Sequence, residues 1–152
     1  MNYWLMKSEP SSYSIDDLKK EKVACWDGVR NYQARNFMRD EMKIDDLVLF
    51  YHSNAKPSGV IGVAKVCSLP YPDHTAYEIN SPYFDARSTK ENPVWMMVDI
   101  AFIEKFSAIL SLDELKTYTK LEKMVLLKKG SRLSIQPVTK SEFDFISKLA
   151  QK

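Results

Sequence analysis

The chain has 152 residues, of which 45% are hydrophobic and 28% are charged, and its formal net charge is +2. This composition excludes a disordered tail and a membrane protein, and the length is that of one ordinary domain with a core of its own. A net charge so close to zero argues against wrapping of duplex DNA by bulk attraction, so any contact with nucleic acid must be local.

The cysteines and the first residues bear on the cellular compartment. The N-terminal ten residues show no secretory signal pattern, and no run reaches the ~18 apolar residues of a membrane-spanning helix. Cys25 and Cys67 imply no disulfide framework, which favours a reducing interior: the cytoplasm or nucleoid of a bacterium, or the nucleus of a eukaryotic cell. Because these cysteines and the two histidines, His52 and His74, lack zinc-ligand spacing, we expect no metal and no other cofactor.

The first 42 residues predict a strand, a brief extended piece over 23–26 and two helices. Residues 2–6 have the composition of a buried strand, which we expect to stop at the sequence KSEP because proline cannot donate to a sheet ladder. Ser14 and Asp17 are spaced as in a capping box and predict a short helix over 15–20. The spacing of apolar residues then predicts a second helix over 32–42.

Strands are predicted in the middle of the chain. The apolar patterns indicate strands over 47–52, 59–66 and 94–102. The clean alternation of residues 94–102 is the strongest of these signals. In residues 47–52 a period of two places Tyr51 on one face and Phe50 and His52 on the other.

Residues 68–93 separate two of these strands without a regular pattern. They hold four prolines together with Tyr71, Tyr77, Tyr83 and Phe84. A connection of this length without structure of its own is usually functional or clamped onto the domain.

The C-terminal part predicts further short elements. Capping boxes at Ser111 and Thr139 predict helices, and Pro137 is expected to end a last strand. The expected elements are helices over 112–116, 121–129 and 140–150 and a strand over 132–138. Strands gathered in the middle, with short helices between and after them, indicate an α+β domain whose mixed sheet is curved or barrel-like.

Signals of catalysis are weak. Cys25 and His52 are the only plausible nucleophile and base, and no residue in the sequence pattern supplies the third, orienting group. A buried structural cysteine is commoner than an activated one, and a histidine satisfied at the edge of the core is the simpler reading of His52. No catalytic or phosphate-cradling motif is present in the sequence, which is weak evidence against an enzyme.

A basic run lies near the C-terminus, with six cations against one acid. It has two readings, a solvated face that complements helix ends and a patch that attracts phosphate. The cations are Lys116, Lys120, Lys123, Lys128, Lys129 and Arg132.

Residues 25–36, CWDGVRNYQARN, form an unusually crowded turn. Gly28 permits a close backbone approach, Trp26 offers a stacking face, and Arg30 and Asn31 offer groups suited to base edges or phosphates. The simpler interpretation has Trp26 in the core, Asp27 and Asn31 as turn and helix-cap residues, and Arg30 paired with an acid. The turn alone does not separate these two interpretations.

Four motifs in the same order over nearly the whole chain resemble the EVE domain family. They are WLMKSEP at 4–10, WDGVRNYQARN at 26–36, LVLFYHSN at 47–54 and LSIQPV at 133–138. The resemblance implies one domain over 1–152 with a PUA-like pseudo-barrel fold, related to YTH and ASCH domains. It also implies binding of nucleic acid, through a modified cytosine in DNA or a base in RNA, in a pocket.

The resemblance also implies which residues line that pocket. They are Lys7, Ser8, Glu9, Trp26, Asp27, Gly28, Val29, Arg30, Asn31, Tyr51, His52, Ser53, Arg132 and Ser134. We expect the exit of the first strand, the turn around Gly28 and the strand tip at 51–53 to converge on one flat base.

Physical roles follow for a base that is gripped by stacking and by hydrogen bonds. Trp26 and Tyr51 are expected to supply the faces. Ser8, Asn31, Ser53 and the amides near Gly28 are expected to supply donors and acceptors, and Lys7, Arg30 and Arg132 to hold phosphates. The alternatives are a small nucleotide- or nucleoside-processing enzyme that uses the same pocket, and a protein-interaction module with an exposed apolar patch.

Overall fold

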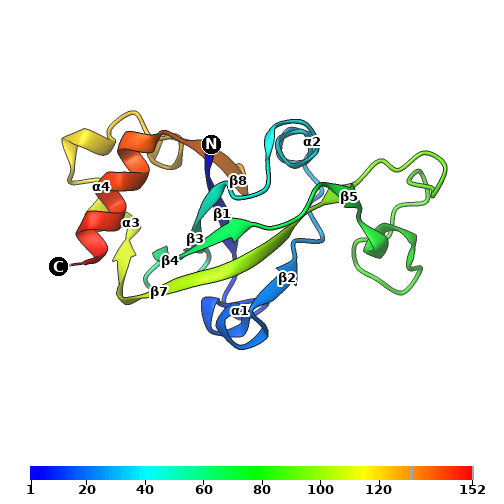
Figure 1. Cartoon of the computed structure of the whole chain (residues 1–152), viewed down its shortest axis with the longest axis horizontal. Coiled ribbons are helices and arrows are strands. Elements are labelled where there is room, and N and C mark those ends of the chain that lie inside the picture. Colours follow the sequence, from blue (N-terminus) through cyan, green and yellow to red (C-terminus); the bar gives the residue numbers. More distant parts are fainter. Residues whose placement is uncertain (131, 152) are drawn as a thin grey trace.

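A mixed six-stranded sheet forms the centre of the molecule (Figure 1). The computed structural model describes residues 1–130 and 132–151. The strands, in spatial order, are β2 (Val23–Cys25), β7 (Asp99–Ser111), β4 (Gly59–Val66), β3 (Leu47–His52), β1 (Tyr3–Ser8) and β8 (Ile135–Val138). Only the β1–β3 pair is parallel among these.

Short helices and a two-stranded ribbon surround this sheet. The helices are α1 (Ile15–Glu21), α2 (Tyr32–Asn36), α3 (Leu112–Leu115) and α4 (Lys140–Ala150), with a π-helical turn η1 (Phe37–Glu41) and 3-10 turns η2 (His74–Tyr77), η3 (Thr119–Leu121) and η4 (Val125–Leu127). The ribbon pairs β5 (Tyr71–Pro72) with β6 (Met96–Met97). Figure 1 shows α3 and α4 at one end of the long axis and the excursion around β5 at the other. The predicted α+β class is therefore confirmed.

Two apolar layers cover the two faces of the sheet. Phe50 lies in the layer that includes side chains of α1 and α2, and Tyr51 lies in the layer that includes side chains of α3 and α4. The period-two prediction for β3 is confirmed by this division. An extra residue of β4 faces the step between Phe50 and Tyr51, and such bulges bend a sheet. The sheet is thus curled, as expected.

Several local signals gave the observed elements. The side chains of Ser14 and Thr139 each accept a hydrogen bond from the backbone amide three residues on, and the carboxylates of Asp17 and Glu142 accept from the amides of these two cap residues. Because these bonds satisfy amides that a helix start leaves unpaired, α1 and α4 begin where the capping boxes predicted. The predicted bounds of β3 and β4 are also confirmed.

The prediction of one strand over 94–102 was wrong. The chain changes partners at Val98, because β6 pairs with β5 whereas β7 pairs with β2 and β4. The amide of Trp26 donates to the Val98 carbonyl at this break. Beyond Phe102 the strand continues to Ser111 with mostly exposed side chains, so no apolar alternation marks its second half.

Further predictions need correction. β1 does not stop at the KSEP sequence but continues to Ser8, and the last strand begins at Ile135 and not at residue 132. Residues 121–129 form no single helix, since the buried Leu121, Met124 and Leu126 do not follow the spacing of one helix face. The helix predicted over 32–42 changes from α to π at Phe37. Pro137 lies inside β8 and does not end it, which an edge strand tolerates.

In the described part of the chain, no helix combines the length and apolarity needed to cross a bilayer.

Candidate functional site

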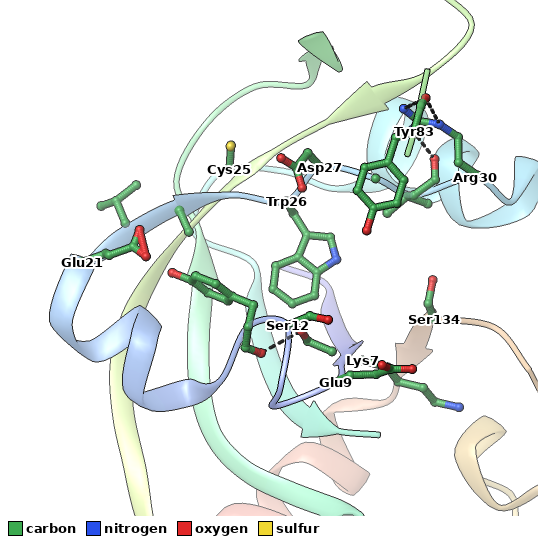
Figure 2. A pocket seen from close by; sticks show the side chains of 16 residues that line it. Lys7, Glu9, Ser12, Glu21, Cys25, Trp26, Asp27, Arg30, Tyr83 and Ser134 are labelled. Carbon is green, nitrogen blue, oxygen red and sulfur yellow. Dashed lines mark hydrogen bonds between the residues drawn. The ribbon is translucent and has the colours of Figure 1, made fainter. Parts of the chain in front are cut away.

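A cleft of about 780 Å³ opens between the exit of β1 and the turn around Gly28 (Figure 2). Nine residues that the sequence singled out line it: Lys7, Ser8, Glu9, Trp26, Asp27, Gly28, Val29, Arg30 and Ser134. The other lining residues are Ser12, Tyr13, Glu21, Val23, Ala24, Cys25 and Tyr83. Two of the three predicted segments therefore converge.

Backbone contacts at the end of β1 hold one wall of the cleft. The Lys7 amide donates to the Ser134 carbonyl over 2.8 Å, which places the segment before β8 beside the strand exit. The Ser8 hydroxyl donates to the Tyr13 carbonyl over 2.8 Å and fixes the loop that leads into α1. Segments far apart in the sequence thus form a continuous surface.

Gly28 is required by its contact with Tyr83. Its φ of +79° lies in the left-handed region, and a Cβ atom there would lie 2.7 Å from Cζ of the Tyr83 ring. No side chain fits at that distance, so the ring rests directly on the backbone of the turn. Tyr83 thereby reaches the cleft from the long 68–93 segment, which was expected to be functional or clamped onto the domain.

Arg30 supplies the clamp. Its Nη1 donates to Asp73 Oδ2 over 3.0 Å and to the Val29 carbonyl, and its Nη2 donates to Thr75 Oγ1. Nε and Nη2 both donate to the carbonyl of Tyr83, over 3.0 and 2.7 Å. Guanidinium has five N–H donors, and these five bonds use all of them. Arg30 is thus occupied inside the protein and does not offer the phosphate contact that the resemblance led us to expect.

Asp73 is the buried partner of this clamp, with none of its surface exposed. Oδ2 also accepts from the Gly28 amide over 2.8 Å, and Oδ1 accepts from Thr75. Burial by itself raises the pKa of Asp73, but the hydrogen bonds from Thr75, Gly28 and Arg30 outweigh it and bring the pKa below its ordinary value. The charged carboxylate therefore ties the turn to the 68–93 segment.

Polar groups without protein partners face the cleft. Figure 2 shows the Tyr83 hydroxyl pointing into the space beside Ser134. The indole nitrogen of Trp26 lies on the side of the indole that faces this space. Within residues 1–130 and 132–151, no protein group bonds Trp26 Nε1, the Tyr83 hydroxyl or the Ser134 hydroxyl. A few convergent polar groups in a concave site are typical of a ligand pocket.

Tyr13 also lines the cleft, and its hydroxyl oxygen is fully buried beside the Glu21 carboxylate. Burial and the nearby Glu21 carboxylate raise the pKa of Tyr13 to about 12. This hydroxyl therefore keeps its proton and remains a donor at neutral pH.

The two expected stacking faces do not face each other. Trp26 is 8% exposed, and its ring lies perpendicular to that of Phe50 with the ring centroids 5.6 Å apart, so most of the indole belongs to the core. Tyr51 is 3% exposed and lies in the other apolar layer. Since neighbouring residues of a strand point to opposite faces, contact of Trp26 with Phe50 excludes Tyr51 from the same space. The exposed aromatic ring is that of Tyr83, at 41%.

Four other predicted residues stand outside the cleft. Asn31 caps α2 by accepting from the Ala34 amide, and the Ser53 amide donates to the Ser8 carbonyl. His52 Nε2 accepts from the Ile15 amide over 3.1 Å, which makes it the satisfied histidine at the core edge. Arg132 is exposed two residues before Ser134.

The candidate nucleophile and base are not arranged for catalysis. Cys25 is exposed at the cleft, where it had been expected to be buried, and desolvation and the Asp27 carboxylate raise the pKa of its thiol. Burial lowers the pKa of His52, whose Nε2 already accepts a hydrogen bond from the Ile15 amide.

Two charged residues that line the cleft also have shifted pKa values. Desolvation and the Asp73 carboxylate raise the pKa of Asp27. Burial lowers the pKa of Lys7, whose ammonium lies 5.6 Å from the centroid of the Tyr51 ring.

Sequence reasoning missed Tyr83 and Asp73. Both lie in the 68–93 segment, 53 and 43 residues from Arg30. The available signal was the group of tyrosines in a long, proline-rich connection. That signal marks the segment as functional without saying which aromatic residue reaches the site.

Comparison with known proteins places this geometry in a family. The family model described as the EVE domain matches residues 2–149. Rat thymocyte nuclear protein 1 is 47% identical, over 99% of this chain and 74% of that protein. A solved hypothetical protein from Leishmania major has a TM-score of 0.94 and 50% identity, with 99% of this chain and 95% of that one covered.

A further solved relative carries a ligand. The crystal structure of human THYN1 protein in complex with DNA containing 5-methylcytosine has a TM-score of 0.93 and 44% identity, and it covers 100% of this chain and 99% of that one. The curled, PUA-like sheet that the motifs implied is thereby confirmed, and the chain belongs to the EVE domain family.

Proposed function

We propose that this chain binds DNA containing 5-methylcytosine and holds the modified base, turned out of the helix, in the cleft beside Trp26 and Tyr83 without altering it chemically. The observation that carries the proposal is the human relative, whose complex contains 5-methylcytosine DNA and whose crystallised chain is 44% identical and matched over 99% of its length. The unpartnered polar groups that meet in the cleft of this chain support it.

The cleft matches the chemistry of a cytosine edge. Cytosine presents acceptors at O2 and N3 and a donor at its N4 amine. Trp26 Nε1 is a donor, and the hydroxyls of Tyr83 and Ser134 both donate and accept. An extruded base is read through such bonds to its pairing edge, in a pocket that excludes water.

Stacking comes from Tyr83 in this account. Its ring is exposed, and both Gly28 beneath it and Arg30 at its carbonyl hold it in place. Stacking of a base on an aromatic side chain is worth about 1–3 kcal/mol. A ring that is already held loses little conformational entropy when the base arrives.

Phosphate contacts come from cations near Ser134. Arg132 is exposed and Lys7 lines the cleft, whereas Arg30 has no donor to spare. Lys128 and Lys129 are exposed on the segment that leads to Arg132. This location favours the phosphate-attracting reading of the basic run, and it requires few cations because one nucleotide enters the cleft.

Binding without chemistry is favoured by the state of Cys25 and His52. The thiol has a raised pKa and the histidine nitrogen is occupied, so neither is prepared for nucleophilic attack or proton transfer. Mass spectrometry of the oligonucleotide after prolonged incubation with the protein is expected to return the methylated base unchanged. Conversion of the base would contradict this part of the proposal.

The test is a fluorescence anisotropy titration with oligonucleotides that differ only in one 5-methyl group. Burial of a methyl group contributes about 0.8 kcal/mol, so the methylated strand should bind at least about fourfold more tightly. Tyr83→Ala should weaken binding to the methylated strand by about tenfold or more through loss of stacking. Tyr77→Phe is the matched control. Tyr77 belongs to the same segment, but its hydroxyl donates to the Thr89 carbonyl and the residue does not line the cleft. Equal affinities for the two strands, or undiminished binding by Tyr83→Ala, would overturn the proposal.

A further inference from the structure

An apolar tip projects beside the cleft. Nine large apolar side chains are exposed among the described residues, and three of them, Ile79, Tyr83 and Phe84, fall within residues 79–84. Ile79 is 80% exposed and Phe84 is 41% exposed. Scattered exposed apolar residues need no explanation, but a local concentration next to a binding site does.

The chain around this tip is braced by hydrogen bonds. The Ser81 amide donates to the Glu78 carbonyl over 2.9 Å, and the Phe84 amide donates to the Ser81 carbonyl over 3.2 Å. Two bonds from Arg30 hold the Tyr83 carbonyl. The apolar side chains are therefore presented by a fixed turn, at little further cost in conformational entropy on binding.

The tip is continuous with the cleft. Tyr83 lines the cleft, whereas Phe84 and Ile79 do not. A base that is extruded turns out of the stack about its own backbone. A duplex whose base is held against Tyr83 therefore lies at the mouth of the cleft, next to the exposed side chains that flank Tyr83 in residues 79–84.

We propose that residues 79–84 form a wedge loop that enters duplex DNA where the modified base leaves the stack, with Phe84 and Ile79 filling the vacated space. The proposal rests on the proposed function and adds duplex DNA as the form of the partner. Proteins that distort DNA insert apolar side chains between base steps in this way, and they thereby offset the loss of stacking. Single-stranded DNA has no such gap to fill.

The experiment compares the double variant Ile79→Ser/Phe84→Ser with the wild-type protein on one methylated sequence, as a fully paired duplex and as a single strand. The wedge predicts a loss of at least about tenfold in affinity for the duplex and a change of less than about twofold for the single strand. Ile103→Ser is the matched control, since Ile103 is 44% exposed on β7 and does not line the cleft. Thermal melting of the free variant should match the wild type, because both replaced side chains are exposed.

Fluorescence of 2-aminopurine placed beside the methylated position gives an independent readout. Wild-type protein should change this fluorescence in the duplex, and the double variant should change it less at equal saturation, because the wedge alters stacking next to the vacated site. Equal losses on duplex and single strand, loss on neither, or wild-type binding to the single strand alone would each overturn the wedge. Failure of the proposed function looks different. The wild-type protein would then bind methylated and unmethylated oligonucleotides equally well, both as duplex and as single strand.

Discussion

The guanidinium of Arg30 and the carboxylate of Asp73 lie 3.0 Å apart, with Asp73 completely buried, and this pair joins the turn around Gly28 to the 68–93 segment. Arg30 belongs to the turn that forms one wall of the cleft, and it also bonds the carbonyl of Tyr83, whose ring is exposed in that cleft. Arg30 is therefore a positioning residue. Its variants should change the fold of the site before they change any contact with DNA.

Arg30→Ala should lower the free energy of unfolding by about 3 kcal/mol, because it leaves a buried carboxylate without its cation. Arg30→Lys should recover little, since one ammonium cannot bond Asp73, Thr75 and the Tyr83 carbonyl together. Urea denaturation measures both changes. Arg87→Ala is the control, because the Arg87–Asp85 pair has similar geometry but an arginine that is 70% exposed, and it should have a much smaller effect. Full stability of Arg30→Ala together with a reduced salt dependence of DNA binding would instead identify a phosphate contact.

Gly28→Ala should disable the site, and Gly130→Ala tests the reason. The φ angle is +79° at Gly28 and +76° at Gly130, so alanine costs about 1–2 kcal/mol of backbone strain at either position. Only at Gly28 would the new Cβ overlap the Tyr83 ring, which adds about 1–3 kcal/mol or displaces the ring. Gly28→Ala should thus lose both stability and DNA affinity, whereas Gly130→Ala should lose only the smaller share of stability. Similar DNA affinities for the two variants would contradict the stacking role of Tyr83.

His52 should make stability depend on pH. Burial lowers its pKa in the folded protein below the ordinary value of about 6.5. Above that pH the imidazole is neutral in the folded and in the unfolded chain, so His52 causes no loss of stability there. As the pH falls below about 6.5 the unfolded chain takes up a proton more readily than the folded one, so stability decreases.

The measurement for His52 is the free energy of unfolding in urea at several pH values between about 5 and 8. His52→Gln keeps an acceptor for the Ile15 amide but does not titrate, so its profile should be flatter in this range. A variant profile as steep as that of the wild type would assign the pH dependence to other groups.

Arg132→Ala should weaken binding to methylated and unmethylated DNA by the same factor and reduce the salt slope by about one. The reason is that Arg132 is exposed near Ser134 and is proposed to contact phosphate, which carries no base information. Anisotropy titrations at three salt concentrations measure the slope. Lys148→Ala, which removes an exposed cation from α4, should leave it unchanged. Loss of the methyl preference in Arg132→Ala would place this residue at the base instead.

The sequence carried the local features of the fold and not the ones set by distant contacts. β3 and α4 were predictable because a continuous apolar run and a capping box are written in neighbouring residues. Residues 103–111 carry no apolar alternation because most of their side chains are exposed, although they complete β7. The break at Val98 depends on a change of strand partner that no local pattern reports.

The same division holds for the site. The motifs around Ser8 and Gly28 converge as expected, but Tyr51 could not join them, since its strand turns alternate residues to opposite layers. The partnership of Arg30 with Asp73 spans 43 residues and a connection without periodicity. Only the three-dimensional structure shows that the guanidinium is already in use.

The indole N–H signals of the three tryptophans offer the most direct test of base entry into the cleft. Trp4 Nε1 donates to Asp46 and Trp95 Nε1 donates to Asp85, whereas Trp26 Nε1 has no partner in the described chain. In ¹H–¹⁵N spectra recorded during titration with methylated DNA, the Trp26 signal, assigned by its loss in Trp26→Phe, should move while the Trp4 signal stays in place. A Trp26 signal that is unchanged when the protein is saturated with methylated DNA would contradict binding of the base in this cleft.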